Sequence, residues 1–148
     1  MLHIQDAAQW TEDLIRTFIR TSAANTLADG TGEKAWTDCL VGFAAGDDAM
    51  FREYKVHVGE FHWTPEEIFN KRFSEHKAAP SELTVISYIL PQTEPTRAAN
   101  RGADKRPAER WARTRIYGEQ FNTALHRHLV ESFAGRGICA VAPTLCPD

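Results

Sequence analysis

Arginine and lysine residues gather in one stretch of the sequence, between Glu94 and Arg115. The stretch holds seven basic residues against three acidic ones, so its net charge is +4, whereas the rest of the chain carries −7. The basic residues are Arg97, Arg101, Lys105, Arg106, Arg110, Arg113 and Arg115. Guanidinium groups present forked donors that match the oxygens of phosphate and carboxylate. The pattern predicts a site for one anionic partner; the alternative is a solvated face whose arginines form surface ion pairs.

The expected position of this stretch favours binding. The run "LTVISYIL" at 83–90 is almost wholly apolar and β-branched, which predicts a central strand covered on both faces. A sixteen-residue loop, Pro91–Arg106, is expected to follow, and Pro107 then opens a long helix that reaches about Phe133. Ligands of α/β sheets lie beyond the carboxyl ends of strands, and helix N-termini favour anions. The residues expected to bind the anion are Arg97, Arg101, Arg106 and Arg110.

Other residues that could do chemistry form no recognisable motif. Glycine-rich phosphate loops and nucleophile elbows are missing from the sequence. His126 and His128 lie two residues apart in the predicted long helix and therefore point in different directions. His57 and His62 flank a predicted turn with Glu60 between them, and solvated or capping histidines are favoured there over a metal site. We therefore predict no metal site.

The three cysteines bear on redox chemistry and location. Cys39, Cys139 and Cys146 are widely spaced and odd in number, which argues against a disulfide framework and against a paired metal motif. No apolar run approaches the roughly 20 residues that a membrane span needs, and the N-terminus does not resemble a secretory signal. We expect reduced thiols, no membrane association and a cytoplasmic location.

The remaining elements follow from apolar spacing and turn residues. A chain of 148 residues with 43% hydrophobic and 25% charged residues suits a single globular domain. Helices are expected from Asp6 to the Asn25–Gly32 stretch, across "AMFREYKVHV", and after Thr64, where Glu67 completes a capping box. Strands are expected at 39–44 and, after the glycines of "GRG", at 138–142.

The predicted fold is α/β with helices packed on a small sheet. Strands 83–90 and 138–142 flank the long helix, which would act as a crossover connection between them. A strand, a crossover helix and a second strand form a βαβ-like unit, in which the two strands run parallel.

Five segments resemble the N-terminal half of iron–sulfur proteins related to epoxyqueuosine reductase. They are "LVGFAAGDDAMFREYK", "GEFHWTPEEIF", "LTVISYILPQTEPTRAANR", "ERWARTRIYGEQFNTALHRHLVE" and "GICAVAPTL". The resemblance implies a cobalamin-binding domain, normally followed by a ferredoxin-like domain with two iron–sulfur clusters. It also implies a cofactor-binding role for Tyr117 and Gly118, which fit a family motif, whereas Gln120, Phe121 and Asn122 replace its Asp-Tyr-His ending.

Two departures from the family limit what the chain would do alone. It has no cysteine run with the spacing that iron–sulfur clusters require, so no cluster is expected in this chain. It also lacks the acid that the family places before an Ala-Pro pair; here Ala140 and Val141 precede that pair. The ferredoxin-like domain is absent, and the chain reads as a truncated or split N-terminal portion of such an oxidoreductase, inactive by itself.

Three functions remain open at this point. The first is that truncated oxidoreductase portion, whose partner would be an iron–sulfur half on a separate chain. The second is a stand-alone binding module that holds a corrinoid or another anionic ligand at the arginine stretch. The third is an RNA-associated protein whose basic residues contact tRNA phosphates, although the acidic remainder disfavours extensive backbone contact.

Overall fold

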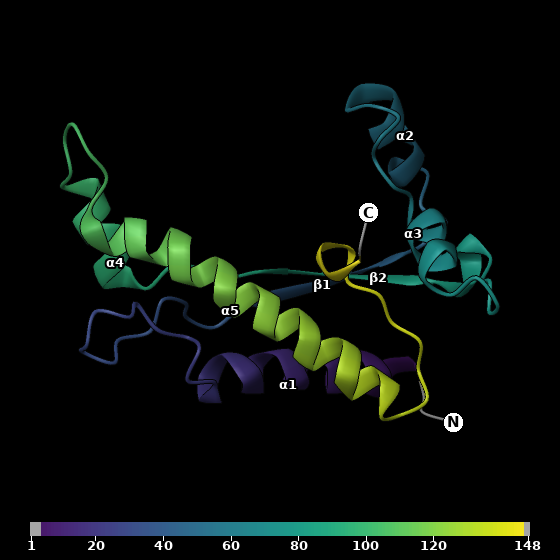
Figure 1. The fold of residues 1–148 in the computed structure, drawn as a ribbon, viewed down its shortest axis with the longest axis horizontal. Helices are drawn as coiled ribbons and strands as arrows, with labels where there is room; N and C mark the ends of the chain where they lie inside the picture. Colours follow the sequence, from purple (N-terminus) through teal and green to yellow (C-terminus); the bar gives the residue numbers. More distant parts are fainter. Residues whose placement is uncertain (1–3, 147–148) are drawn as a thin grey trace. The chain divides into compact units, whose positions relative to one another are not determined.

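The computed structural model describes residues 4–146 of the chain. In chain order its elements are α1 (Ile4–Thr21), β1 (Leu40–Ala45), α2 (Met50–His57), α3 (Pro65–Arg72), the 3-10 turn η1 (Pro80–Glu82), β2 (Thr84–Ile89), α4 (Glu94–Arg101), α5 (Glu109–Ala134) and the 3-10 turn η2 (Pro143–Leu145) (Figure 1). None of the helices in this range combines the length and apolar composition that crossing a bilayer requires.

The chain divides into two compact units. The first unit comprises Met1–Leu40 and Tyr88–Leu129, and the second comprises Val41–Ser87 and Val130–Asp148. The expectation of a single domain stays a prediction.

Buried apolar side chains form the core of the first unit, where α1 lies beside α5 (Figure 1). They are Ile15, Ile19, Leu27, Ala35, Cys39, Phe121, Leu125 and Leu129. The α5 members recur every fourth residue, as expected of one helical face. The ring of Phe18 packs against Phe121, with centroids 5.6 Å apart, and stacks on His128 at 4.7 Å. Burying each large apolar side chain contributes about 1.5–3 kcal/mol.

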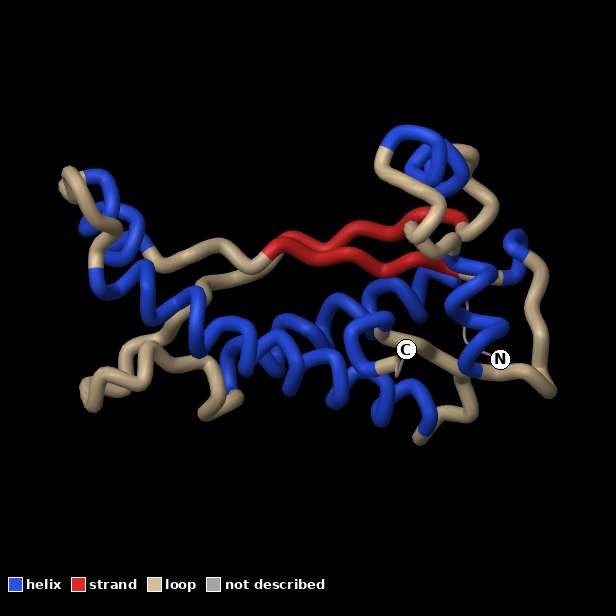
Figure 2. The backbone as a smooth tube through the Cα atoms, turned by 45° about the horizontal axis from the view of Figure 1, so that its top comes forward, coloured by secondary structure: helices blue, strands red, loops and turns tan. Residues whose placement is uncertain are grey.

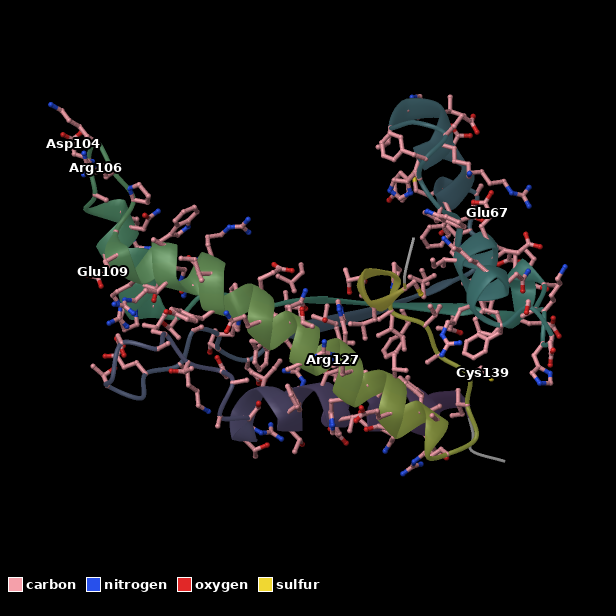
Figure 3. The ribbon with its side chains drawn as sticks, viewed as in Figure 1. Glu67, Asp104, Arg106, Glu109, Arg127 and Cys139 are labelled. Atoms are coloured by element: carbon pink, nitrogen blue, oxygen red, sulfur yellow. The ribbon has the colours of Figure 1, made fainter. Side chains whose placement is uncertain are left out.

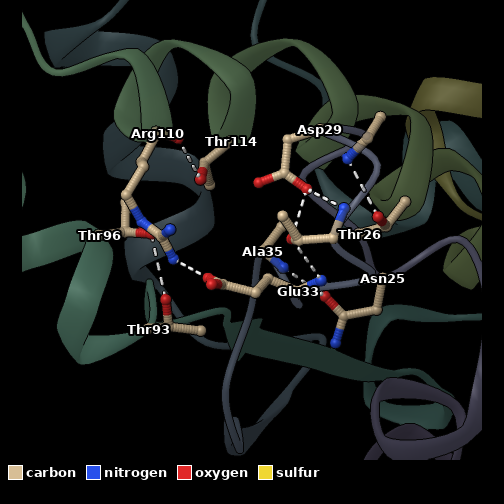
Figure 4. Close-up of polar contacts among 11 residues, drawn as sticks. Asn25, Thr26, Asp29, Glu33, Ala35, Thr93, Thr96, Arg110 and Thr114 are labelled. Carbon is tan, nitrogen blue, oxygen red and sulfur yellow. Dashed lines mark hydrogen bonds and ion pairs between the residues drawn. The ribbon is translucent and has the colours of Figure 1, made fainter.

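The long loop between α1 and β1 is held by one buried amide, that of Asn25. Its Nδ2 donates to the carbonyl oxygens of Ile19 (2.9 Å) and Trp36 (3.0 Å). Its Oδ1 accepts from the backbone N–H groups of Ala35 (3.1 Å) and Trp36 (2.9 Å). Asn25 is 3% exposed; its bonds to Ile19 and Ala35 are buried, and its two bonds to Trp36 are partly buried. One side chain thereby links the end of α1 to the chain just before β1, across a loop that has no regular structure. Figure 4 shows Asn25 together with Ala35.

The second unit contains two short helices that are set by local signals. Thr64 accepts from the backbone of Glu67, and Glu67 accepts in return from Thr64, so the predicted capping box is confirmed. Lys55 of α2 pairs with Glu67 at 3.0 Å, which ties the two helices together. Asn70 exchanges two hydrogen bonds with the backbone of Ala78, at 2.9 and 3.2 Å, and so fixes the chain that follows α3.

The sheet has two strands, β1 and β2, which lie side by side (Figure 2). They are antiparallel. The bridge between Trp36 and Gln92 continues the antiparallel pairing beyond the strand ends. Neither strand has a fully buried residue, so β2 is not a central strand covered on both faces.

The prediction of parallel strands at 83–90 and 138–142 is therefore wrong. Residues 138–142 have no regular secondary structure. After α5 the chain turns through Gly137, whose φ is +71°, and the N–H of Ile138 bonds back to Phe133 at 3.0 Å. Pro143 then begins η2, so the apolar run at 138–142 is only five residues long. Such a short run has strand-like composition, but composition does not specify a pairing partner. The strand that pairs with β2 is instead β1.

Candidate anion-binding site

A short helix positions the first arginines of the basic stretch. Residues 91–106 were expected to form a loop, and α4 occupies half of it. Its inner side is fixed by Thr96, which is fully buried and whose Oγ1 lies 3.1 Å from Oγ1 of Thr93 (Figure 4). Pro95 stands in the first turn of the helix, where its missing N–H and fixed φ are tolerated. Threonine followed two residues later by proline is a sequence pattern typical of helix starts. The sequence interpretation missed this pattern at Thr93 and Pro95.

Two arginines of α4 converge on one carboxylate. Nη2 of Arg97 lies 2.7 Å from Oε2 of Glu94, and Nη2 of Arg101 lies 2.6 Å from Oε1. The spacing of three and then four residues places all three side chains on one face of the helix. Hydrogen bonds from Arg101 and charge from both arginines lower the pKa of Glu94. All three side chains are more than half exposed, so the group is open to solvent.

The turn between α4 and α5 carries the next basic residues. Asn100 Oδ1 accepts from the backbone N–H of Ala108 at 3.2 Å, which ties the end of α4 to the start of α5. Asp104 and Arg106 lie at the tip of this turn (Figure 3). Lys105 and Arg106 are exposed. The turn thus adds exposed cations to the stretch that follows α4.

Arg110 and Arg113 serve a different purpose, because they attach the loop after α1 to the first turns of α5. Arg110 forms an ion pair with Glu33 of that loop (Figure 4), and this bond raises the pKa of the Arg110 guanidinium. Arg113 donates to the carbonyl oxygen of Ala28 at 3.0 Å and pairs with Glu109 at 2.9 Å. Within residues 4–146, Nε of Arg110 is buried and has no hydrogen-bond partner. These two arginines are built into packing within the first unit.

Gly118 also takes part in packing. A Cβ atom at this position would stand 2.4 Å from Cζ2 of Trp36, far closer than atoms can approach. The indole ring of Trp36 therefore fills the space that a side chain would need. Tyr117, the other residue predicted to bind a cofactor, is half-buried. Of the six predicted binding residues, Arg97 and Arg101 meet at one carboxylate, Arg106 lies on the adjoining turn, and Arg110 and Gly118 contact the loop after α1.

The sequence interpretation also missed a polar contact in the first unit. Oη of Tyr88, near the end of β2, donates to Oδ1 of Asn122 on α5 at 2.6 Å. Burial raises the pKa of Tyr88, which keeps the phenol protonated and able to donate. The ring of His126 lies 5.9 Å from that of Tyr88, and burial lowers the pKa of His126. Phe121 is fully buried, and both it and Asn122 take part in packing here.

The residues considered for metal or redox chemistry are dispersed. His57 pairs with Glu53 at 3.5 Å, and the ring of His62 packs against Tyr54 at 5.4 Å. Across residues 4–146, no three side chains of His, Cys, Asp or Glu gather as a metal site would require. The cysteines are free thiols, and burial raises the pKa of Cys39.

Comparison of the chain with protein-family models, with curated proteins and with solved structures gives no match. The resemblance to epoxyqueuosine reductase-like proteins therefore stays a prediction.

Proposed function

We propose that the protein is a binding module for a phosphate-bearing ligand, held at the outer face of α4 and the adjoining turn. One observation carries the proposal: Arg97 and Arg101 bind the two oxygens of a single carboxylate at 2.7 and 2.6 Å. Two guanidinium groups that reach one two-oxygen anion can reach another of similar size. Arginine forms bonds of this kind with carboxylate and phosphate alike.

The charge of the surrounding surface supports the same proposal. Glu94 neutralises one of the two cations on the outer face of α4, so that face keeps one positive charge. Lys105 and Arg106 add two exposed cations on the next turn, against Asp104. A concentrated positive field on an otherwise acidic chain attracts a localised anion more than an extended polyanion. The acidic remainder would repel a long nucleic acid outside this face.

The resemblance to the reductase family suggests two sources of phosphate. One is the nucleotide tail of cobalamin, and the other is the backbone of tRNA. Both sources of phosphate are consistent with a cytoplasmic protein, and the cytoplasm is the location that we propose. An oxidoreductase role would need a second chain to supply the iron–sulfur ligands. Because Gly118, Phe121 and Asn122 are used in packing within the first unit, we favour binding over redox chemistry.

The test is a pair of titrations, of cobalamin and of tRNA, into the wild type and into Arg97→Ala with Arg101→Ala. Charge-assisted hydrogen bonds contribute about 1.5–3 kcal/mol each when well formed, and exposure to solvent reduces that. We therefore expect the double variant to bind at least about tenfold more weakly, at about 1.4 kcal/mol per tenfold. The loss should shrink as salt is raised from low to moderate concentration.

A matched control is Arg20→Ala with Arg127→Ala, which removes the same charge from exposed sites of the first unit. Arg127 lies farther along α5 (Figure 3). This control should bind like the wild type. If neither ligand binds the wild type, or if both double variants lose affinity equally, the proposed function is wrong.

A further inference from the structure

We infer that the Glu94 carboxylate occupies the position on Arg97 and Arg101 at which the ligand binds, and that the ligand group that binds there is a phosphodiester. Glu94 is then an internal competitor, which the ligand must displace. The inference rests on the proposed function and adds to it the chemical class of the bound group and the residue that opposes binding.

The first argument is the geometry of the contacts. Each arginine binds a different oxygen of the carboxylate, Oε2 for Arg97 and Oε1 for Arg101. The pair therefore selects an anion with two oxygens on one central atom. A halide ion has a single centre, which the two guanidinium groups would have to share.

The second argument is charge. Glu94 carries one negative charge shared by two oxygens. A phosphodiester has the same pattern, with two non-bridging oxygens and one negative charge on phosphorus. It can replace the carboxylate on the two guanidinium groups without changing the charge that they bind. The nucleotide tail of a corrinoid and the backbone of RNA both contain this group.

The third argument is that Glu94 can leave without disturbing the fold. Its side chain is 58% exposed, and its contacts given above are with the two arginines of its own helix. The opposite side of α4 holds the helix in place through buried Thr96, and Asn100 fixes its end. Displacement therefore requires rotation of one exposed side chain, while the helix that carries the arginines stays in position.

Glu109 provides a matched comparison within the same basic stretch. In the contacts described above Glu109 pairs only with Arg113, at 2.9 Å, and its side chain is 78% exposed. Arg113 is also held by the carbonyl oxygen of Ala28. Glu109→Gln adds the same positive charge to the stretch as Glu94→Gln does, but it frees no pair of converging guanidinium groups.

The experiment measures binding of three probes that contain a phosphodiester: a dinucleoside monophosphate, a short single-stranded RNA and cobalamin. Wild type, Glu94→Gln and Glu109→Gln are compared at low salt, with circular dichroism to confirm folding. We expect Glu94→Gln to bind at least one probe about three- to tenfold more tightly than the wild type. Glu109→Gln should change affinity less than twofold. The probe that gains most identifies the source of the phosphodiester.

Adding Arg97→Ala and Arg101→Ala to Glu94→Gln should remove the gain. Equal gains in Glu94→Gln and Glu109→Gln would overturn the competitor role while leaving the proposed function intact, because general charge would then explain both. Inorganic phosphate that competes as well as the dinucleoside monophosphate would overturn the phosphodiester assignment. Absence of binding by every probe to every variant would overturn the proposed function itself.

Discussion

Gly118 of α5 lies directly against the indole ring of Trp36, so that a Cβ atom at residue 118 would stand 2.4 Å from Cζ2 and 3.0 Å from Cε2 of the ring. This contact brings the loop after α1 onto the long helix. The backbone of Trp36 is held in turn by the buried amide of Asn25. Glycine inside a helix lowers helix stability by up to about 1 kcal/mol relative to alanine. Packing against Trp36 explains why glycine nevertheless stands at this position.

Replacing Gly118 by alanine is expected to destabilise the protein. Alanine would gain up to about 1 kcal/mol of helix propensity, but overpacking against a rigid ring costs about 1–3 kcal/mol. We predict a net loss of up to about 2 kcal/mol in the free energy of unfolding, measured by urea denaturation. Gly102→Ala is the control, since its Cβ would meet no atom closer than 3.7 Å. Stabilisation by Gly118→Ala would show that the ring moves aside freely.

Replacing Asn25 by alanine is expected to lower the free energy of unfolding more than Gly118→Ala does. The change leaves the backbone N–H groups of Ala35 and Trp36 without their acceptor in a buried site. Unsatisfied buried groups cost about 1–3 kcal/mol each, so we predict a loss of about 3 kcal/mol or more. Asn70→Ala, which removes two bonds from a half-buried site, should cost about 1 kcal/mol. Similar losses for both variants would contradict the role given to Asn25.

Stability should also depend on the protonation of His126. Burial lowers its pKa in the folded protein, so the unfolded chain binds the proton more strongly. The free energy of unfolding should therefore fall as pH drops through 6.5, the ordinary value, until the lowered folded pKa has been passed. Glu119 opposes the shift and limits its size.

The His126→Gln variant tests this dependence. Urea denaturation at intervals from pH 7.5 to 5 should give a shallower decline for His126→Gln than for the wild type. His76→Gln, at an exposed position, should decline as the wild type does. Equal slopes for wild type and His126→Gln would rule out His126 as the source.

The parts of the fold that could be predicted are those with local signals. The apolar spacing on α1 and α5 and the capping box at Thr64 depend on neighbours within one or two turns, and these predictions are confirmed. The strand expected at 39–44 is present as β1. Strand pairing is not local, since β1 and β2 are separated by α2, α3 and η1. Apolar composition alone could not show that β2 pairs with β1.

The charge of the candidate site was predictable from the sequence, but the residues that its arginines contact were not. Counting arginines locates the basic stretch, but the attachment of Arg110 to Glu33 joins residues 77 positions apart. The loop that carries Glu33 has no periodicity from which this contact could be derived. The contact of Glu94 with Arg97 and Arg101 was predictable in principle, because these arginines lie three and seven residues after it. A helix that begins at Glu94 puts all three side chains on one face.

The most direct test of the central claim is to observe the arginine side chains while ligand is added. In ¹H–¹⁵N spectra of the wild type, the Nε–H signals of Arg97 and Arg101 should shift together as a dinucleoside monophosphate or cobalamin is titrated. The Nε–H signal of Arg127, on a later part of α5, should stay in place. Saturable shifts confined to Arg97 and Arg101 are the result that we predict. Shifts spread evenly over all exposed arginines, or no shift at saturating ligand, would contradict binding at α4.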